Sequence, residues 1–182
     1  MHSPAPRAQR AWIGLGSNLP SGLGDSAQTL AAAGERIAAL PGTRLEASSS
    51  LYRSPPFEAQ GPDFLNQVVR VHTTLTAAQL LQALLAIETA AGRERPYRNA
   101  PRTLDLDLLL YGTDSADSAF LTLPHPRMAQ RLFVLMPLAE IDPDVPVGQR
   151  GSARQLLAQL RQTDPAQVCT RLAEGPGQQA SR

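Results

Sequence analysis

The chain has 182 residues, a formal net charge of +1, 42% hydrophobic and 4% aromatic residues. This length fits one globular domain with a small appendage, and the near-zero charge gives no bulk electrostatic case for a nucleic-acid or membrane partner. The single cysteine, Cys169, excludes an internal disulfide and a thiolate metal cluster, so a reducing cytosol is the simplest setting. No apolar run approaches the length of a membrane span, and we expect a cytoplasmic protein.

The first two thirds of the chain predict two strand–helix–strand units. Apolar side chains at three- and four-residue spacing predict helices, and alternating apolar and polar side chains predict strands. Asp25 or Ser26 can cap the first helix, Thr76 can cap the second, and Gly92 ends it. The predicted elements are a strand over 11–16, a helix over 25–40, strands over 43–52 and 64–75, a helix over 77–91 and a strand over 102–111.

The remainder of the chain predicts additions to these units. They are a turn over 113–118, a short strand over 120–123, a helix over 132–141 that Pro137 interrupts, and a helix over 152–161. We expect a disordered lead over 1–9, a single domain over 10–174 and a disordered tail over 175–182. The element order predicts an α+β fold, a ferredoxin-like βαββαβ sandwich with C-terminal additions, in which helices cover one sheet face and the other is free to carry a site.

The strand after Arg102 carries the sharpest chemical signal. Asp105 and Asp107 alternate with leucines, so both carboxylates point to the same face, with Cβ atoms roughly 6.5–7 Å apart. Magnesium together with phosphate oxygens would relieve the repulsion between the two carboxylates. Taken alone, the pair is explained equally well as two aspartates that are merely exposed to solvent.

The loop before this strand is dense in arginine. Arg93, Arg95 and Arg98 lie in it, and Arg102 stands at the entrance of the strand. A guanidinium suits bidentate contact with phosphate, so this loop strengthens the case for a phosphate-binding site beside the aspartates. For any single arginine, a solvent-exposed loop position is an equal alternative.

Other motifs are weaker. Gly14-Leu15-Gly16-Ser17-Asn18 follows a strand and suits a backbone nest that meets a ligand, although no third glycine completes a dinucleotide fingerprint. No Walker A sequence occurs, which excludes a P-loop ATPase. His125 lies between two prolines, and spacing alone favours a turn histidine without chemistry. Phe57, Phe64 and Asn66 could stack on and read a flat heterocycle, although core packing explains the aromatics better.

Six blocks occur in order at fitting separations. They are Gly14-Leu15-Gly16-Ser17-Asn18-Leu19, Ser50-Leu51-Tyr52-Arg53-Ser54-Pro55-Pro56, Phe64-Leu65-Asn66, Glu88-Thr89-Ala90-Ala91-Gly92-Arg93, Pro101-Arg102-Thr103-Leu104-Asp105-Leu106-Asp107 and Leu123-Pro124-His125-Pro126-Arg127-Met128. Together they resemble the 6-hydroxymethyl-7,8-dihydropterin pyrophosphokinase family over residues 11–145. The Pro-Arg-Thr-Leu-Asp-Leu-Asp string is very specific to that family.

The resemblance implies transfer of a whole diphosphate from ATP to the hydroxymethyl group of a dihydropterin, with release of AMP, as a step of folate biosynthesis. It also implies two Mg²⁺ ions and a ferredoxin-like fold, which agrees with the predicted element order. The expected partners are ATP and 6-hydroxymethyl-7,8-dihydropterin. We expect no nucleic acid, no membrane and a monomer.

The resemblance also implies roles for individual residues. The catalytic positions are Arg93, Arg102, Asp105 and Asp107, of which the two aspartates bind metal. The ATP-binding positions are Glu88, Arg93, Arg102, Leu108, Thr122, His125 and Arg131. The pterin-binding positions are Ser54, Pro55, Phe57, Phe64, Asn66, Asp105 and Phe133.

The arginine loop departs from the family pattern. Asn99-Ala100 stands where the family often carries a tryptophan, Pro96 where it sometimes carries a lysine, and Leu85 where some members carry a glutamine. These differences bear on how the loop closes and on any role for Arg95 and Arg98. They do not affect the prediction for Asp105 and Asp107.

Two other functions stay open on the sequence. A nucleotidyltransferase could use the same aspartate pair, and it would release diphosphate where a pyrophosphokinase releases AMP. A ferredoxin-like domain could instead bind a small molecule or RNA without turnover. RNA binding needs stacking aromatics and a basic face, so the low aromatic content and the near-zero charge argue against it.

Overall fold

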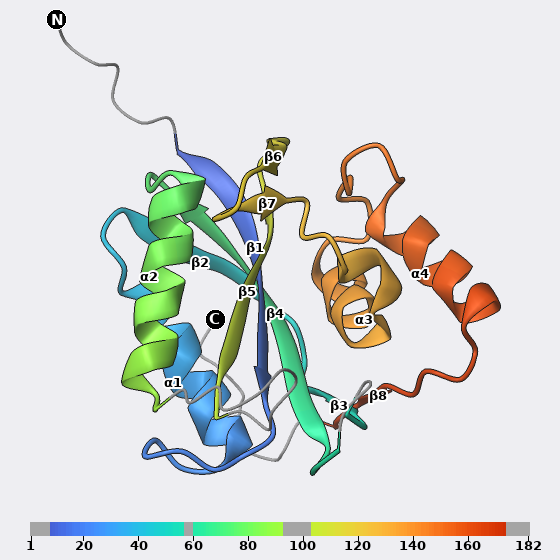
Figure 1. Ribbon diagram of the computed structural model, residues 1–182, viewed down its shortest axis with the longest axis horizontal. Coiled ribbons are helices and arrows are strands. Elements are labelled where there is room, and N and C mark those ends of the chain that lie inside the picture. The colour runs from blue at the N-terminus through green and yellow to red at the C-terminus, as the bar shows by residue number, and fades with distance from the viewer. Residues whose placement is uncertain (1–7, 57–59, 93–102, 174–182) are drawn as a thin grey trace, which may run out of the picture.

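The computed structural model describes residues 8–56, 60–92 and 103–173. A twisted sheet runs through the middle of the molecule, with α1 and α2 on one side and α3 and α4 on the other (Figure 1). Among the helices of the described ranges, none combines the length and the apolar character that crossing a bilayer requires.

The main sheet confirms the ferredoxin-like prediction. Over the described ranges its strands are β1 (Gln9–Ser17), β2 (Thr43–Ser48), β3 (Tyr52–Ser54), β4 (Phe64–Thr73), β5 (Asp105–Tyr111) and β8 (Thr170–Arg171). Their order is β5-β1-β4-β3-β8, with β2 also beside β4, and neighbouring strands are antiparallel. If β2 and β3 are taken as two halves of one strand, this is the fourth–first–third–second order of a βαββαβ sandwich.

Two predictions about strands were wrong, and one strand was missed. The strand expected over 43–52 is broken, because the backbone N–H of Ser50 turns away from β4 to the carboxylate of Glu140. The turn expected over 113–118 contains β6 (Ala116–Asp117), which pairs with β7 (Thr122–Leu123). The strand β8 was not predicted at all.

The helices α1 (Ser26–Ala38) and α2 (Ala77–Ala90) begin where capping chemistry predicts. Asp25 caps α1 and Thr76 caps α2, each in a capping box with a glutamine three residues later. Both helices bury their apolar faces against one side of the sheet. The residues of this core include Leu15, Leu30, Ile37, Val71, Leu80, Leu84, Leu106 and Leu108.

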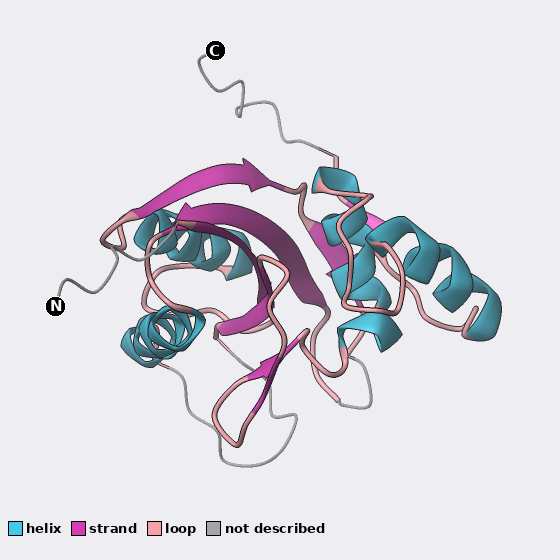
Figure 2. Ribbon diagram, turned by 90° about the horizontal axis from the view of Figure 1, so that it is seen from above, coloured by secondary structure: helices cyan, strands magenta, loops and turns pink. Residues whose placement is uncertain are grey.

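The other sheet face also carries helices, so the prediction that it is free was wrong (Figure 2). The one-turn helix η1 (Met128–Gln130), α3 (Leu132–Ile141) and α4 (Ala153–Thr163) cover part of it. Pro137 lies inside α3 and does not end it. A second core forms beneath them, with Trp12, Val68, Leu109, Leu135 and Leu138 among its members. The candidate site occupies the part of this face that α3 leaves open.

Candidate active site

The register of the sheet places the predicted acids and the predicted amide in one row. Asp105 of β5 and Asn66 of β4 both pair with Gly16 of β1. Directly paired residues of antiparallel strands present their side chains to the same face. Asp107 pairs with Gly14 in the next row, so both carboxylates face the same side, as predicted.

The missing side chain of Gly16 makes a trough between Asp105 and Asn66, whereas a Cβ at Gly14 would meet the Leu109 side chain at 3.5 Å. A Cβ at Gly16 would lie 3.6 Å from Asn66 Oδ1 and 3.9 Å from Phe64 Cδ1. The prediction of a backbone nest was wrong, because Gly14 and Gly16 both lie inside β1. The missing side chain of Gly16, rather than its amide, is what the site uses.

A β-bulge brings His125 to the acid pair. The pairing of β5 with β1 skips Leu109, which is the extra residue of the bulge. The Leu109 carbonyl accepts the backbone N–H of His125 at 2.9 Å. His125 Nε2 then lies 3.9 Å from Asp107 Oδ1, so the histidine that spacing alone made doubtful belongs to the site.

His125 is held in its neutral form. Burial, together with the charges of Arg131 and Arg127, lowers the pKa of His125 to about 4, against a smaller opposing effect of Asp105. Its Nδ1 accepts the backbone N–H of Arg127 at 3.3 Å. The proton of the neutral ring is therefore on Nε2, which faces Asp107 as a hydrogen-bond donor.

The start of α3 brings a cation and an aromatic ring to the same place. Arg131 Nη1 lies 3.9 Å from Asp107 Oδ2. The Arg131 guanidinium carbon lies 5.6 Å from the centre of the Phe133 ring, within the range of a cation–π contact. The predicted ATP position Arg131 and the predicted pterin position Phe133 are thus neighbours.

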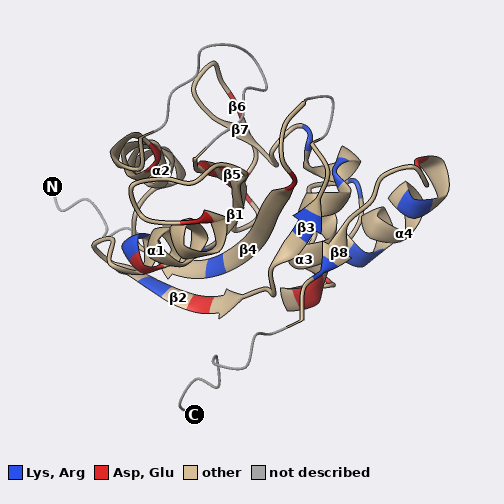
Figure 3. Cartoon of the chain, turned by 90° about the horizontal axis from the view of Figure 1, so that it is seen from below, with Lys and Arg blue, Asp and Glu red and all other residues tan. Residues whose placement is uncertain are grey.

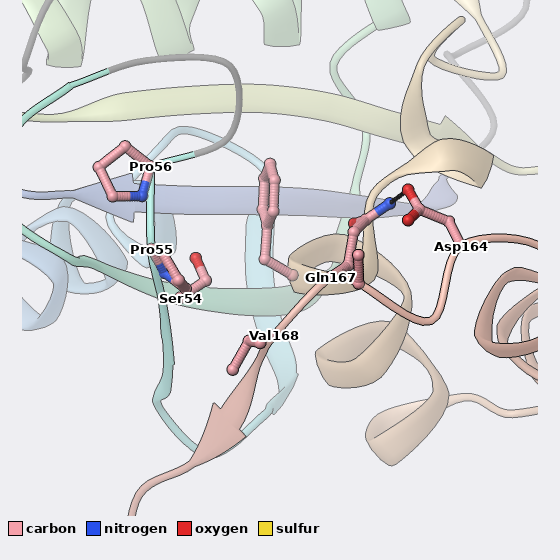
Figure 4. Close-up of a pocket in the computed structure, with 8 residues that line it drawn as sticks. Ser54, Pro55, Pro56, Asp164, Gln167 and Val168 are labelled. Carbon is pink, nitrogen blue, oxygen red and sulfur yellow. Dashed lines mark hydrogen bonds between the residues drawn. The ribbon is translucent and has the colours of Figure 1, made fainter.

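A pocket of about 210 Å³ opens beside Phe133. Ser54, Pro55 and Pro56 line it from β3 and the loop that follows, and Asp164, Ala166, Gln167 and Val168 line it from the C-terminal side. In Figure 4 Ser54, Pro55 and Pro56 lie across the pocket from Asp164 and Gln167. Residues 164–168 carry no motif, and no signal in the sequence points to them.

Two further predicted pterin positions adjoin this pocket. Phe64 pairs with Ser54 across β3 and β4. Asn66 donates from Nδ2 to Ser54 Oγ at 2.9 Å and to the Tyr52 carbonyl at 3.4 Å. Because these bonds fix the amide, its Oδ1 is turned toward the trough over Gly16.

Glu88 holds the strand that carries the acids. Its side chain is 1% exposed, and Oε1 accepts the backbone N–H of Leu106 at 2.6 Å. Leu106 lies between Asp105 and Asp107 in the sequence. A direct ATP contact of Glu88 stays a prediction, and in the structure its buried carboxylate fixes the backbone between the two acids.

Leu108 and Thr122 lie along the outer edge of β5. The Leu108 side chain is 3% exposed and packs in the core beneath α1 and α2, on the face opposite Asp107. The N–H of Leu106 points away from β1 and donates to Glu88. Backbone groups two residues apart in a strand point in the same direction, so the N–H and C=O of Leu108 also point to the edge of β5 away from β1. Leu108 can therefore contact a ligand on this side only through its backbone. Thr122 is half-buried on β7, which lies against β5.

Three predicted site residues, Arg93, Arg102 and Phe57, lie outside the described ranges, as do Arg95 and Arg98. Their roles stay predictions. Within the described ranges, Figure 3 shows acidic positions on β5 and basic positions on β3, β8 and α4.

The sequence matches a known family over most of its length. The family model for 7,8-dihydro-6-hydroxymethylpterin-pyrophosphokinase (HPPK) matches residues 12–143. A 2-amino-4-hydroxy-6-hydroxymethyldihydropteridine pyrophosphokinase of Methylorubrum extorquens is 44% identical over 160 residues, covering 87% of this chain and 96% of the relative. Proteins of the same name from Synechocystis sp. and Pseudomonas aeruginosa are 46% identical over 134 residues and 43% identical over 151 residues. They cover 74% and 82% of this chain, and 67% and 91% of their own lengths.

The fold matches solved structures as well. A crystal structure of a triple mutant of HPPK-DHPS from Plasmodium falciparum aligns with a TM-score of 0.70 at 12% sequence identity. It covers 93% of this chain and 47% of the solved chain, so the present chain spans about half the length of that structure. A structure of HPPK-DHPS in complex with substrates aligns with a TM-score of 0.64 at 12% identity and covers 85% of this chain and 46% of the solved one. At these identities the likeness shows the fold.

Proposed function

The chain belongs to the 7,8-dihydro-6-hydroxymethylpterin-pyrophosphokinase family, and we propose that the row of residues over β5, β1 and β4 carries out that family's reaction. The enzyme is an ATP-dependent pyrophosphokinase of folate biosynthesis. It transfers a diphosphate from ATP to the hydroxymethyl group of 6-hydroxymethyl-7,8-dihydropterin and releases AMP. The observation that carries the residue assignment is the row of Asp105, Gly16 and Asn66, which places the acid pair and the amide next to the pocket side on one face of the sheet.

The acid pair fits magnesium. Within the described part of the chain, no three His, Cys, Asp or Glu side chains gather into a set that could hold a metal ion unaided. Asp105 and Asp107 nevertheless offer the donors that magnesium uses beside nucleotides, namely one or two carboxylates completed by water and phosphate oxygens. We assign two Mg²⁺ ions to this pair. When bound, the ions neutralise phosphate charge and lower the pKa of the attacking hydroxyl.

Arg131 and His125 complete the part of the proposed site that binds the phosphates of ATP. Both lie 3.9 Å from Asp107, so a phosphate group held beside that carboxylate would come within reach of a guanidinium and of a neutral N–H donor. The guanidinium balances negative charge, and the imidazole donates without adding charge. Arg93 and Arg102 are proposed to join them from the loop before β5, on the family resemblance alone.

Aromatic rings and one amide side chain form the part of the proposed site that binds the pterin. Phe64 and Phe133 offer rings for stacking, and Ser54 and Pro55 close one wall. Because Asn66 Nδ2 is already bonded to Ser54, Oδ1 is the atom left to accept an N–H of the heterocycle. The pocket volume of about 210 Å³ is below the ~300–1,000 Å³ typical of drug-sized ligands, which suits a small bicyclic ring.

The transfer itself is an in-line displacement. The hydroxymethyl oxygen attacks the β-phosphorus of ATP, the bond from that phosphorus to the oxygen bridging the α-phosphorus breaks, AMP leaves with the bridging oxygen, and the hydroxyl proton passes to solvent. Such a reaction depends on positioning and charge neutralisation. A neutral His125 with its proton on Nε2 is a donor to phosphate and not a base in this scheme.

The test of the function is a magnesium-dependent assay of AMP formation. With ATP and the dihydropterin together, the products should be AMP and the pterin diphosphate in equal amounts, and AMP should be at background when the dihydropterin is left out. Release of diphosphate instead would identify a nucleotidyltransferase. AMP release at the same rate with and without the dihydropterin would contradict the assignment.

We also propose that the chain acts in the cytoplasm as a monomer with one domain over 10–174 and with no nucleic-acid or membrane partner. The net charge of +1 and the continuous sheet from β5 to β8 support this assignment. Sedimentation of the purified chain with its substrates tests it, and a stable dimer would contradict it.

Replacing Gly16 with valine should block the trough. A β-branched residue favours a strand, so the fold should persist. The added side chain would stand between Asp105 and Asn66, and we expect the KM for the dihydropterin to rise about tenfold. The control is Gly34→Ala in α1, where nothing lies within 4 Å of the added Cβ. Equal KM values for both variants would show that the trough does not receive substrate.

A further inference from the structure

The wall of the pocket opposite Ser54 is formed by residues 164–168, which we name the wall segment. It follows α4 and lies beyond residue 143, where the match to the family model ends. Asp164, Gln167 and Val168 line the pocket that Ser54 and Phe133 also line. The family model therefore says nothing about what this segment does.

The wall segment is held by hydrogen bonds and is not backed by packed side chains. Asp164, Gln167 and Val168 also line a second cavity of about 300 Å³ on the side of Met136 and Arg161. A segment with cavities on two sides gains little from packing. Its position must therefore depend on the bonds that it makes.

Gln167 makes three such bonds. Its Nε2 donates to the Gln130 carbonyl and to Asp164 Oδ2, each at 2.9 Å, and its Oε1 accepts the backbone N–H of Leu132 at 2.9 Å. Leu132 is the first residue of α3, and the first N–H groups of a helix need partners from outside the helix. Arg131, the N-cap residue, cannot supply this bond because a guanidinium has no acceptor atom.

The turn that Gln167 holds is the one that carries Arg131 and Phe133. Both side chains belong to the candidate site, through the 3.9 Å approach of Arg131 to Asp107 and the place of Phe133 in the pocket. One side chain thus fixes the pocket wall and the helix start at the same time.

A second attachment follows directly in the chain. The strand β8 pairs with β3, and the Leu172 N–H donates to the Leu51 carbonyl at 2.8 Å. Arg171 bonds Ser50 Oγ at 2.9 Å and lies 3.3 Å from Glu140 of α3. The wall segment is therefore tied both to β3 and to α3, the two elements between which the pocket lies.

We propose that Gln167 is a positioning residue for the dihydropterin, and that it acts by fixing the wall segment and the first turn of α3. This proposal rests on the function proposed above and adds to it a residue outside the matched region. Gln167 need not touch the reacting atoms. Its loss should weaken the pterin side of the reaction and leave the chemistry at Asp105 and Asp107 largely intact.

The test compares Gln167→Met with Gln162→Met. Methionine keeps the length of the side chain and removes all three bonds, and Gln162 is exposed on α4. We expect Gln167→Met to raise the KM for the dihydropterin about fivefold while kcat changes by less than about twofold, with Gln162→Met unchanged. A merely structural role would lower the melting temperature without this split between KM and kcat.

Equal KM values for the two variants would overturn the proposal. If Gln167→Met does not fold, Gln167→Glu decides by the same criterion, because the carboxylate still accepts from Leu132 and loses both donated bonds. Wild-type enzyme that forms no AMP would instead refute the proposed function, so the two failures are distinguishable.

Discussion

Replacing Asp107 with alanine should lower the rate of AMP formation about a thousandfold and leave the fold intact. The carboxylate lies 3.9 Å from both His125 Nε2 and Arg131 Nη1. Loss of a metal-binding carboxylate removes several kcal/mol of charge stabilisation from the transition state, and each ~1.4 kcal/mol is tenfold in rate. The side chain is 33% exposed, so stability should change by less than about 1 kcal/mol.

The matched control is Asp114→Ala. Asp114 is an exposed aspartate in the turn directly after β5, so the variant loses the same charge without touching the site. It should keep the wild-type rate and melting temperature. A wild-type rate in Asp107→Ala, measured at saturating ATP and dihydropterin, would remove the aspartate from the mechanism.

Replacing Glu88 with alanine should cost about 2–4 kcal/mol of unfolding free energy and also reduce turnover. The carboxylate is 1% exposed and accepts the Leu106 N–H at 2.6 Å. Alanine would leave that buried donor unsatisfied and open a cavity beneath β5. Turnover should fall because Leu106 sets the backbone between Asp105 and Asp107.

Urea unfolding measures the stability, with Glu35→Ala as the control. Glu35 is an exposed glutamate of α1, and its loss should stay within about 0.5 kcal/mol. Glu88→Gln keeps an acceptor for Leu106 and should lose less stability than Glu88→Ala. A Glu88→Ala protein as stable as Glu35→Ala would show that the buried bond does not hold β5.

Much of the fold could be predicted from local patterns. Asp25 and Thr76 cap the predicted helices, and the element order gives the observed sheet order. The break between β2 and β3 could not be predicted, because it depends on a bond between Ser50 and Glu140, ninety residues apart in the sequence. The strand β8 has only two residues and both are exposed, so it leaves no hydrophobic pattern to read.

Some positions of the candidate site could also be predicted from local patterns, and others could not. The alternation that puts Asp105 and Asp107 on one face also puts Leu108 on the other, so the strand pattern alone limits Leu108 to a backbone contact. The place of His125 depends on a bulge at Leu109, and a bulge has no signature in a run of leucines. Gln167 meets Leu132 only through the packing of α3 and α4. Contacts of this kind arise in the folded chain and not in its local sequence.

The most direct measurement is a crystal structure with Mg²⁺, an unreactive ATP analogue and the dihydropterin. We expect ions about 2.0–2.1 Å from carboxylate oxygens of Asp105 and Asp107, bridged to the phosphates, with the pterin ring between Phe64 and Phe133. Bound nucleotide with no ion beside either aspartate would contradict it.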